Sequence, residues 1–95
     1  MRVEIKKRVE KDTEKLPIQI QLLAAKEIER LKAVKNLREL DNVIPMEGTN
    51  EPYFRLNFSN YRYIFYFDET TKTVSVRRLK HRKDSYKKHN LPWRK

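Results

Sequence analysis

The last fifth of this 95-residue chain carries most of the net positive charge, interleaved with aromatic rings. Residues 77–95 contain nine basic residues and one acidic residue, against 14 basic and 12 acidic residues in 1–76. Lysine and arginine bind phosphate oxygens, and flat rings such as those of Tyr86 and Trp93 stack on unpaired bases. The alternative is a solvated basic end, above all after His89. The residues predicted to bind nucleic acid in this way are Arg77, Arg78, Lys80, Lys83, Lys87 and Lys88.

Arg55 and Arg62 form a second basic feature, within two stretches of alternating residues, 53–58 and 61–67. Strand side chains alternate between the two faces of a sheet. If residues 59–60 form a hairpin turn, Arg55 lies diagonally across from Arg62, on the face without the apolar rows. Two like charges gain nothing from each other there, so this face predicts an anionic partner. The alternative is a pair of ordinary charges on the wet side of a sheet.

The same hairpin predicts where the core lies. A two-residue turn pairs Phe58 with Tyr61 and Leu56 with Tyr63, which brings both apolar rows to one side. A third antiparallel strand over 73–79 continues this side with two valines. The aromatic row of the second strand is therefore expected to be core rather than an RNA-stacking platform. It consists of Tyr61, Tyr63, Phe65 and Phe67.

The first half of the chain predicts a short strand and two helices. Residues 1–5 alternate like a half-buried strand, and the charged stretch 6–16 suits a short, mostly solvated helix. Pro17 then interrupts the chain and suits a first helical position. Residues 41–52 break the helical pattern with turn residues. One apolar stripe marks the second helix and comprises Ile20, Leu23, Ala24, Ile28, Leu31 and Val34, with Leu37 and Leu40 extending it loosely.

These elements predict an α+β fold, in which an antiparallel sheet of about four strands carries an N-terminal helical hairpin on one face. The length suits one domain over 1–95, with residues 87–95 as a basic tail. The formal charge of +10 favours polyanionic partners, either nucleic acid or an acidic protein. Cysteine is absent, so disulfides and thiolate metal sites are excluded. With no apolar run long enough to span a bilayer, we expect a cytoplasmic protein that does not enter membranes.

The order of these pieces resembles the RelE/ParE superfamily of toxins from toxin–antitoxin systems. That family runs from an aromatic–arginine pair through a turn to tyrosine–arginine and apolar residues, then a valine-rich strand, histidine–arginine and tyrosine. The resemblance covers residues 1–86 and rests on the order and spacing of the pieces together. It implies an antiparallel sheet with a helical hairpin on one face. The matching pieces are Phe54-Arg55, Tyr61-Arg62, Val74 to Val76, His81-Arg82 and Tyr86.

The resemblance also implies an activity and a site. Toxins of the ribonuclease branch enter the ribosomal A site and cleave messenger RNA without a metal or cofactor, by attack of the ribose 2′-hydroxyl on the adjacent phosphate. Their partner is an acidic antitoxin, which would wrap the helices and the sheet edge in a hetero-oligomer. The residues implied in the active face are Arg55, Arg62, Arg82 and Tyr86, with His81 as a further candidate.

This chemistry requires proton removal, stabilisation of charge on the phosphate, and protonation of the 5′-oxygen. Arginine binds phosphate bidentately and stays charged, so we expect Arg62 and Arg82 to stabilise the transition state and Arg55 to clamp or orient the phosphate. His81, with an unperturbed pKa of about 6.5, suits proton transfer. Its alternative is a strand-end histidine without a chemical role. Tyr86 suits stacking on a base or hydrogen bonding to the phosphate.

The strand that carries Arg55 departs from some ribonuclease members. Those members place a second basic residue or a glutamate there, where this chain has Tyr53 and Asn57. The ParE-like branch shares the fold, inhibits DNA gyrase and needs no nuclease centre. The alternative function is therefore a non-nuclease gyrase inhibitor, and plain nucleic-acid binding is a third hypothesis.

Overall fold

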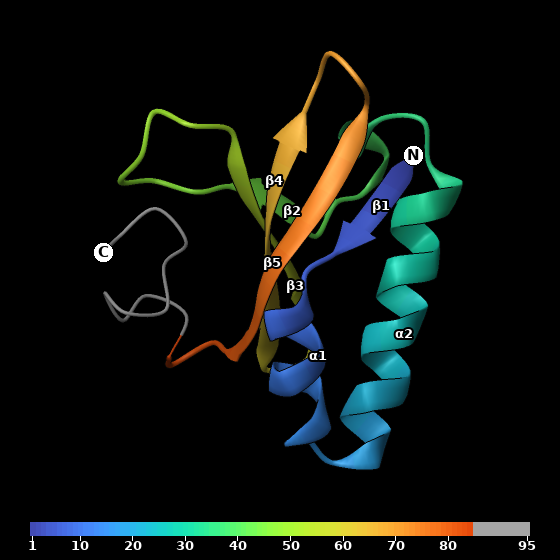
Figure 1. Cartoon of the computed structure of the whole chain (residues 1–95), viewed down its shortest axis with the longest axis vertical. Coiled ribbons are helices and arrows are strands. Elements are labelled where there is room, and N and C mark those ends of the chain that lie inside the picture. Colours follow the sequence, from blue (N-terminus) through green and yellow to red (C-terminus); the bar gives the residue numbers. More distant parts are fainter. Residues whose placement is uncertain (85–95) are drawn as a thin grey trace.

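The structure, a computed structural model, describes residues 1–84 (Figure 1). As predicted, two helices lie on one side of a sheet. No helix within the described residues is long and apolar enough to cross a membrane. In chain order the elements are β1 (Arg2–Ile5), α1 (Lys7–Glu14), α2 (Ile18–Ala33), the 3-10 turn η1 (Leu37–Glu39), β2 (Val43–Pro45), β3 (Tyr53–Phe58), β4 (Tyr61–Asp68) and β5 (Thr73–His81).

The sheet differs from the prediction in strand number and direction. It has five strands in the order β1-β5-β4-β3-β2, and β1 pairs with β5 in parallel, so the sheet is mixed rather than wholly antiparallel. Two parallel strands must be joined by a long crossover connection, and here residues 6–72 form that connection. β2 is the extra strand, which is short and ends at Pro45. Proline is tolerated on an edge strand, where its missing N–H faces no partner.

The hairpin of β3 and β4 has the predicted register. Phe58 pairs with Tyr61 and Leu56 pairs with Tyr63. Ser59 has a φ of 53°, the left-handed conformation that tight hairpin turns use. The aromatic rows of both strands therefore face the helices, and the two arginines of the hairpin lie on the opposite face.

The helices supply one layer of the core. α1 buries Val9 and is otherwise mostly solvated, as predicted. α2 begins after Pro17 and buries three residues of the predicted stripe, Ala24, Ile28 and Leu31.

The predicted apolar stripe is wrong at two points. Leu23 is 42% exposed rather than buried, and the helix does not continue beyond Ala33. The chain leaves the helix after Ala33 and starts a new turn, where Asn36 and Glu39 form a reciprocal capping box. Leu40 is still buried in the core, but η1 places it there rather than a continuation of α2.

Apolar side chains are buried on both faces of the sheet. The main cluster lies between the helices and the sheet and includes the predicted aromatic row. The loop after β2 projects to the left in Figure 1, away from the helices, and begins with the buried Met46. On that side a smaller cluster forms from Met46, Tyr53, Ile64 and Tyr66.

Candidate nucleic-acid interface

Three arginines lie together at one end of the sheet face opposite the helices, which we call the open face. Arg55 on β3 lies diagonally across from Arg62 on β4, because Arg62 pairs with Asn57. Arg82 follows β5, and its backbone N–H donates to the carbonyl of Asn60 in the hairpin turn at 2.8 Å. This hydrogen bond brings the end of β5 beside the turn. The arginine cluster, Arg55, Arg62 and Arg82, therefore draws on three separate parts of the chain.

The charges of the arginine cluster act on one another. Partial burial lowers the pKa of Arg62, and the positive charges of Arg55 and Arg82 lower it further. A bound anion relieves this kind of repulsion between like charges. Arginine nevertheless stays protonated at any working pH. The cluster is therefore a permanent positive site that favours a phosphate group.

Asp12 of α1 forms ion pairs with two of the predicted RNA-binding residues, Arg78 and Lys80. Its carboxylate accepts from Arg78 Nε at 2.9 Å and from the backbone N–H of Leu79 at 3.0 Å, and Lys80 Nζ lies 3.6 Å away. Burial raises the pKa of Asp12, but these hydrogen bonds and positive charges outweigh burial and bring the pKa below its ordinary value. Lys80 pairs directly with Arg62 across the strands. Arg78 fastens α1 to β5, so RNA contact by Arg78 requires this ion pair to open.

His81 lies on the other side of the sheet from the arginine cluster. It pairs with Tyr61, and its ring meets the Tyr61 ring edge-on at 5.2 Å. Tyr61 packs against the main core on the helix side. His81 Nδ1 accepts a hydrogen bond from the backbone N–H of Lys83 at 3.2 Å. The structure therefore does not bring His81 together with the three arginines on the open face.

The other predicted site residues are spread along the end of the chain. Arg77 lies on the open face, its guanidinium 5.5 Å from the centroid of the Tyr66 ring. Lys83 is exposed in the turn after β5. No group of three or more acidic, histidine or cysteine side chains within 1–84 is arranged to hold a metal ion. Three predicted residues lie outside the described residues, namely Tyr86, Lys87 and Lys88.

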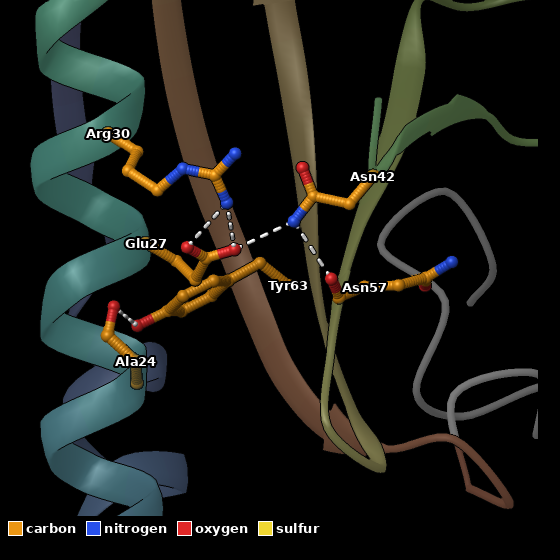
Figure 2. Close-up of polar contacts among 6 residues, drawn as sticks. All are labelled: Ala24, Glu27, Arg30, Asn42, Asn57 and Tyr63. Carbon is orange, nitrogen blue, oxygen red and sulfur yellow. Dashed lines mark hydrogen bonds and ion pairs between the residues drawn. The ribbon is translucent and has the colours of Figure 1, made fainter. Parts of the chain in front are cut away.

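Figure 2 shows a polar network between α2 and β3 that the sequence analysis did not predict. Glu27 of α2 is 8% exposed and accepts two hydrogen bonds of 2.9 Å from Arg30. Asn42 donates to Glu27 at 2.7 Å and to the backbone carbonyl of Asn57 at 2.9 Å, and so links α2 to the strand position opposite Arg62. Two signals were present in the sequence. One was a glutamate within an apolar stripe, and the other was an asparagine interpreted only as a helix breaker.

Tyr63 completes this network on the helix side. Its hydroxyl donates to the carbonyl of Ala24 at 3.3 Å. Burial, helped by the negative charge of Glu27, raises the pKa of Tyr63 to about 12. Tyr63 therefore stays neutral and acts as a structural hydrogen-bond donor rather than as a base.

A cavity of about 480 Å³ opens between α1 and α2, on the side away from the arginine cluster. Its walls include apolar side chains such as Val9 and Ile28, and acidic side chains at Glu10, Glu14 and Glu29. Carboxylates repel phosphate, so this cavity does not suit a nucleic acid. The open face is the better candidate for that interface. Together the two sides define a small α+β protein with a helical layer and a basic face of the kind that binds polyanions.

Comparison with solved structures finds RelE proteins. The chain matches the archaeal RelE–RelB complex from Pyrococcus horikoshii OT3 with a TM-score of 0.70 and 29% identity, over 85% of this chain and 93% of that chain. It matches the RelB–RelE antitoxin–toxin complex from Methanococcus jannaschii with a TM-score of 0.70 and 26% identity, over 87% and 94% of the two chains. The isolated E. coli RelE toxin shares the fold, with a TM-score of 0.59 and 17% identity over 84% and 82%. No family model and no curated protein matches the sequence.

The chain therefore has the fold of the RelE toxins, and the resemblance to the RelE/ParE toxins predicted from the sequence is confirmed. The predicted α+β fold class is confirmed with it, apart from the additional strand and the parallel pairing of β1.

Proposed function

We propose that this chain is the toxin of a toxin–antitoxin pair and that it cleaves messenger RNA on the ribosome. The observation that carries the proposal is the arginine cluster. Three guanidinium groups from β3, β4 and the end of β5 gather on the face opposite α1 and α2, close enough for their charges to lower the pKa of Arg62. A site of this kind suits a phosphate that gains charge during a reaction.

The proposed reaction uses the RNA's own nucleophile. The ribose 2′-oxygen forms a bond to the adjacent phosphorus and gives up its proton, while the bond from phosphorus to the 5′-oxygen breaks and that oxygen takes a proton. The products are a 2′,3′-cyclic phosphate and a 5′-hydroxyl end. Arg62 and Arg82 stabilise the charge on the non-bridging oxygens, and Arg55 orients the phosphate. Lys80 lies directly opposite Arg62, but its ammonium is 3.6 Å from the Asp12 carboxylate, which balances its charge.

The resemblance implies His81 for proton transfer and Tyr86 for contact with the RNA. An imidazole suits proton transfer, and the position of His81 beside Tyr61 means that it would act from the rim of the sheet rather than from the open face. Tyr86 is proposed to stack on a base or to hydrogen-bond the phosphate. The remaining basic residues are proposed to contact the RNA that flanks the cleaved phosphate, and this group comprises Arg77, Arg78, Lys80, Lys83, Lys87 and Lys88.

The proposed partners are an acidic antitoxin and the ribosome with its message, in the cytoplasm. Two of the similar structures are RelE–RelB complexes, which supports an antitoxin partner. An acidic antitoxin segment would compete with RNA for the open face, because both are attracted by the same charges.

The test replaces Arg62 or Arg82 by alanine. Each substitution removes one transition-state contact, so we expect a loss of messenger RNA cleavage of at least about a hundredfold and a loss of growth arrest. Cleavage is measured by mapping message ends in a translation extract. The charge-matched control is Arg38→Ala, because Arg38 is an exposed cation in η1, away from the open face.

Folding and antitoxin binding are measured for each variant, so that a misfolded protein is not taken for an inactive one. The proposal is contradicted if the parent arrests growth while message remains uncut, with Arg62→Ala equally toxic. That result would favour the gyrase-inhibitor hypothesis instead.

A further inference from the structure

Arg77 lies on the open face, at a β-bulge in β5. Phe65 pairs with Val76 and Ile64 pairs with Arg78, so Arg77 is an extra residue in β5 that faces no residue of β4. Val76 faces the core, so alternation directs Arg77 to the open face, and the extra residue returns Leu79 to the core side, opposite Tyr63. Bulges are frequent beside functional sites.

The guanidinium of Arg77 is held in place by neutral groups. Its Nε donates to the Ser75 hydroxyl at 3.0 Å, and its Nη1 donates to the Tyr53 hydroxyl at 3.5 Å. Its plane lies over the Tyr66 ring at 5.5 Å, and Tyr66 meets Tyr53 edge-on at 5.4 Å. None of the ion pairs within residues 1–84 joins Arg77 to a carboxylate. The result is a fixed, planar cation whose charge is not neutralised within the described chain.

A hollow of about 300 Å³ lies beside this guanidinium, which is large enough for a small ligand. Its cationic walls include Lys6 and Arg77, and Ser75 provides a hydroxyl. The two carboxylates in its walls have partners already. Glu4 pairs with an arginine of the same strand at 3.4 Å, and Asp68 accepts two backbone N–H bonds in the turn after β4.

The hollow lies on the same face as the arginine cluster. Tyr66 follows Arg62 by four residues along β4, which corresponds to roughly 13 Å along the strand. Both side chains point away from the helices, because residues two and four apart share a face. An extended RNA strand bound at the arginine cluster therefore passes close to Arg77.

We propose that Arg77 and the hollow beside it form a second RNA subsite, which receives a message nucleotide next to the cleaved phosphate. The base stacks on the outer side of the Arg77 guanidinium, whose inner side is supported by the Tyr66 ring. Lys6 binds the phosphate of that nucleotide. Arginine planes are one of the surfaces on which proteins stack unpaired bases. This inference rests on the proposed function, since it assumes that RNA binds the open face.

The test compares Arg77→Ala with Arg77→Lys, which keeps the charge and removes the plane. The probe is a short single-stranded RNA that carries a 2′-deoxy nucleotide at the cleavage position, with its affinity measured by fluorescence anisotropy. A matched probe lacks the base at the flanking position. We expect both variants to bind the complete RNA roughly tenfold more weakly than the parent. On the probe without the base, Arg77→Lys should bind as the parent does.

Several outcomes overturn the subsite. One is Arg77→Lys binding the complete RNA as tightly as the parent. Another is a loss of affinity for ribosomes without message but not for the short RNA, which would assign the contact to ribosomal RNA. Circular dichroism and antitoxin binding show whether each variant is folded. The two proposals fail separately: if the parent cleaves message but the base makes no difference to binding, only the subsite is wrong, whereas an uncut message contradicts the proposed function itself.

Discussion

Asp12 is the residue at which α1, β5 and the open face meet. β1 ends at Ile5, so within residues 1–84 no strand lies beside the outer edge of β5 beyond this point. Asp12 supplies the missing acceptor for the N–H of Leu79 and neutralises Arg78 and Lys80 at the same time. A buried backbone N–H and a buried guanidinium both cost free energy when they lack a hydrogen-bond acceptor. The Asp12 carboxylate avoids both costs, because it accepts from both groups.

The substitution Asp12→Ala is expected to lower the free energy of unfolding by about 3 kcal/mol, because it leaves the buried Arg78 without its carboxylate. Urea denaturation at pH 7 measures this change. Asp12→Asn should cost less, since an amide oxygen still accepts from Leu79. The matched control is Glu29→Ala, which breaks an exposed pair with Lys32 and should cost less than about 0.5 kcal/mol. Equal losses for Asp12→Ala and the control would mean that the buried pair adds no stability.

The contribution of Asp12 to the free energy of unfolding depends on pH. The pKa of Asp12 in the folded chain lies below its ordinary value of 3.8, so its contribution is complete above that value and is lost as the pH falls through the folded pKa. The stability difference between the parent and Asp12→Asn should therefore be constant from pH 5 to 7 and shrink below about pH 4. A difference that does not change with pH would contradict the lowered pKa.

At the scale of elements, the Glu27–Asn42 contact joins α2 to β3 beneath the hairpin (Figure 2). Asn42 reaches both Glu27 and the carbonyl of Asn57, so it connects the helical layer to the strand that faces Arg62. The network positions β3 relative to α2 and so supports the hairpin that carries two of the three clustered arginines.

Asn42→Ala should therefore lower the free energy of unfolding by about 1–2 kcal/mol, because the buried Glu27 loses a donor and the carbonyl of Asn57 loses a partner. Asn50→Ala, at an exposed loop position, is the control. In a double-mutant cycle with Glu27→Gln, we expect a coupling energy of at least about 0.5 kcal/mol. Additive losses would show that the two side chains do not stabilise each other.

The elements that the sequence predicted well are those defined by local patterns. The hairpin follows from alternating residues around a two-residue turn, and α2 follows from its stripe and Pro17. The parallel direction of β1 and the pairing of β2 depend on partners far along the chain, which no local pattern encodes. The bulge at Arg77 arises from pairing with β4, and strict alternation cannot reveal an extra residue.

The candidate site, like the fold, could be predicted only in part from the sequence. Alternation alone placed Arg55 and Arg62 on one face, and the resemblance to a family added Arg82. The position of His81 on the helix side follows from its pairing with Tyr61, which depends on the exact end of β5. The ion pair of Arg78 was hidden because its partner lies 66 residues earlier in the chain.

At the scale of the whole molecule, the cavity between the helices and the open face differ in charge. The cavity between the helices has acidic walls, whereas the open face carries the arginine cluster and Arg77. A phosphate is therefore attracted to the arginine cluster and repelled by the carboxylates of the cavity, which favours binding of RNA at the open face.

This difference in charge predicts how salt affects binding. The affinity for short single-stranded RNA should fall linearly on a plot of log K against log salt concentration, because bound phosphates release counterions. Arg62→Ala removes one phosphate contact and should reduce the slope by about 0.7, whereas Arg38→Ala should leave it unchanged. Fluorescence anisotropy titrations at several salt concentrations give both slopes. An unchanged slope for Arg62→Ala would place the RNA elsewhere on the molecule.

The central position of β5 has a consequence for the nascent chain. β5 lies between β1 and β4, so residues 2–5 remain without their neighbour until residues 73–76 have been synthesised. Contacts this far apart in sequence form late, and a polypeptide stopped before β5 cannot complete the sheet. Arg82 follows β5 directly, so a growing chain cannot assemble the three guanidinium groups before β5 has left the exit tunnel. A nascent chain in which β5 is still inside the tunnel therefore lacks the site on which the proposed cleavage depends.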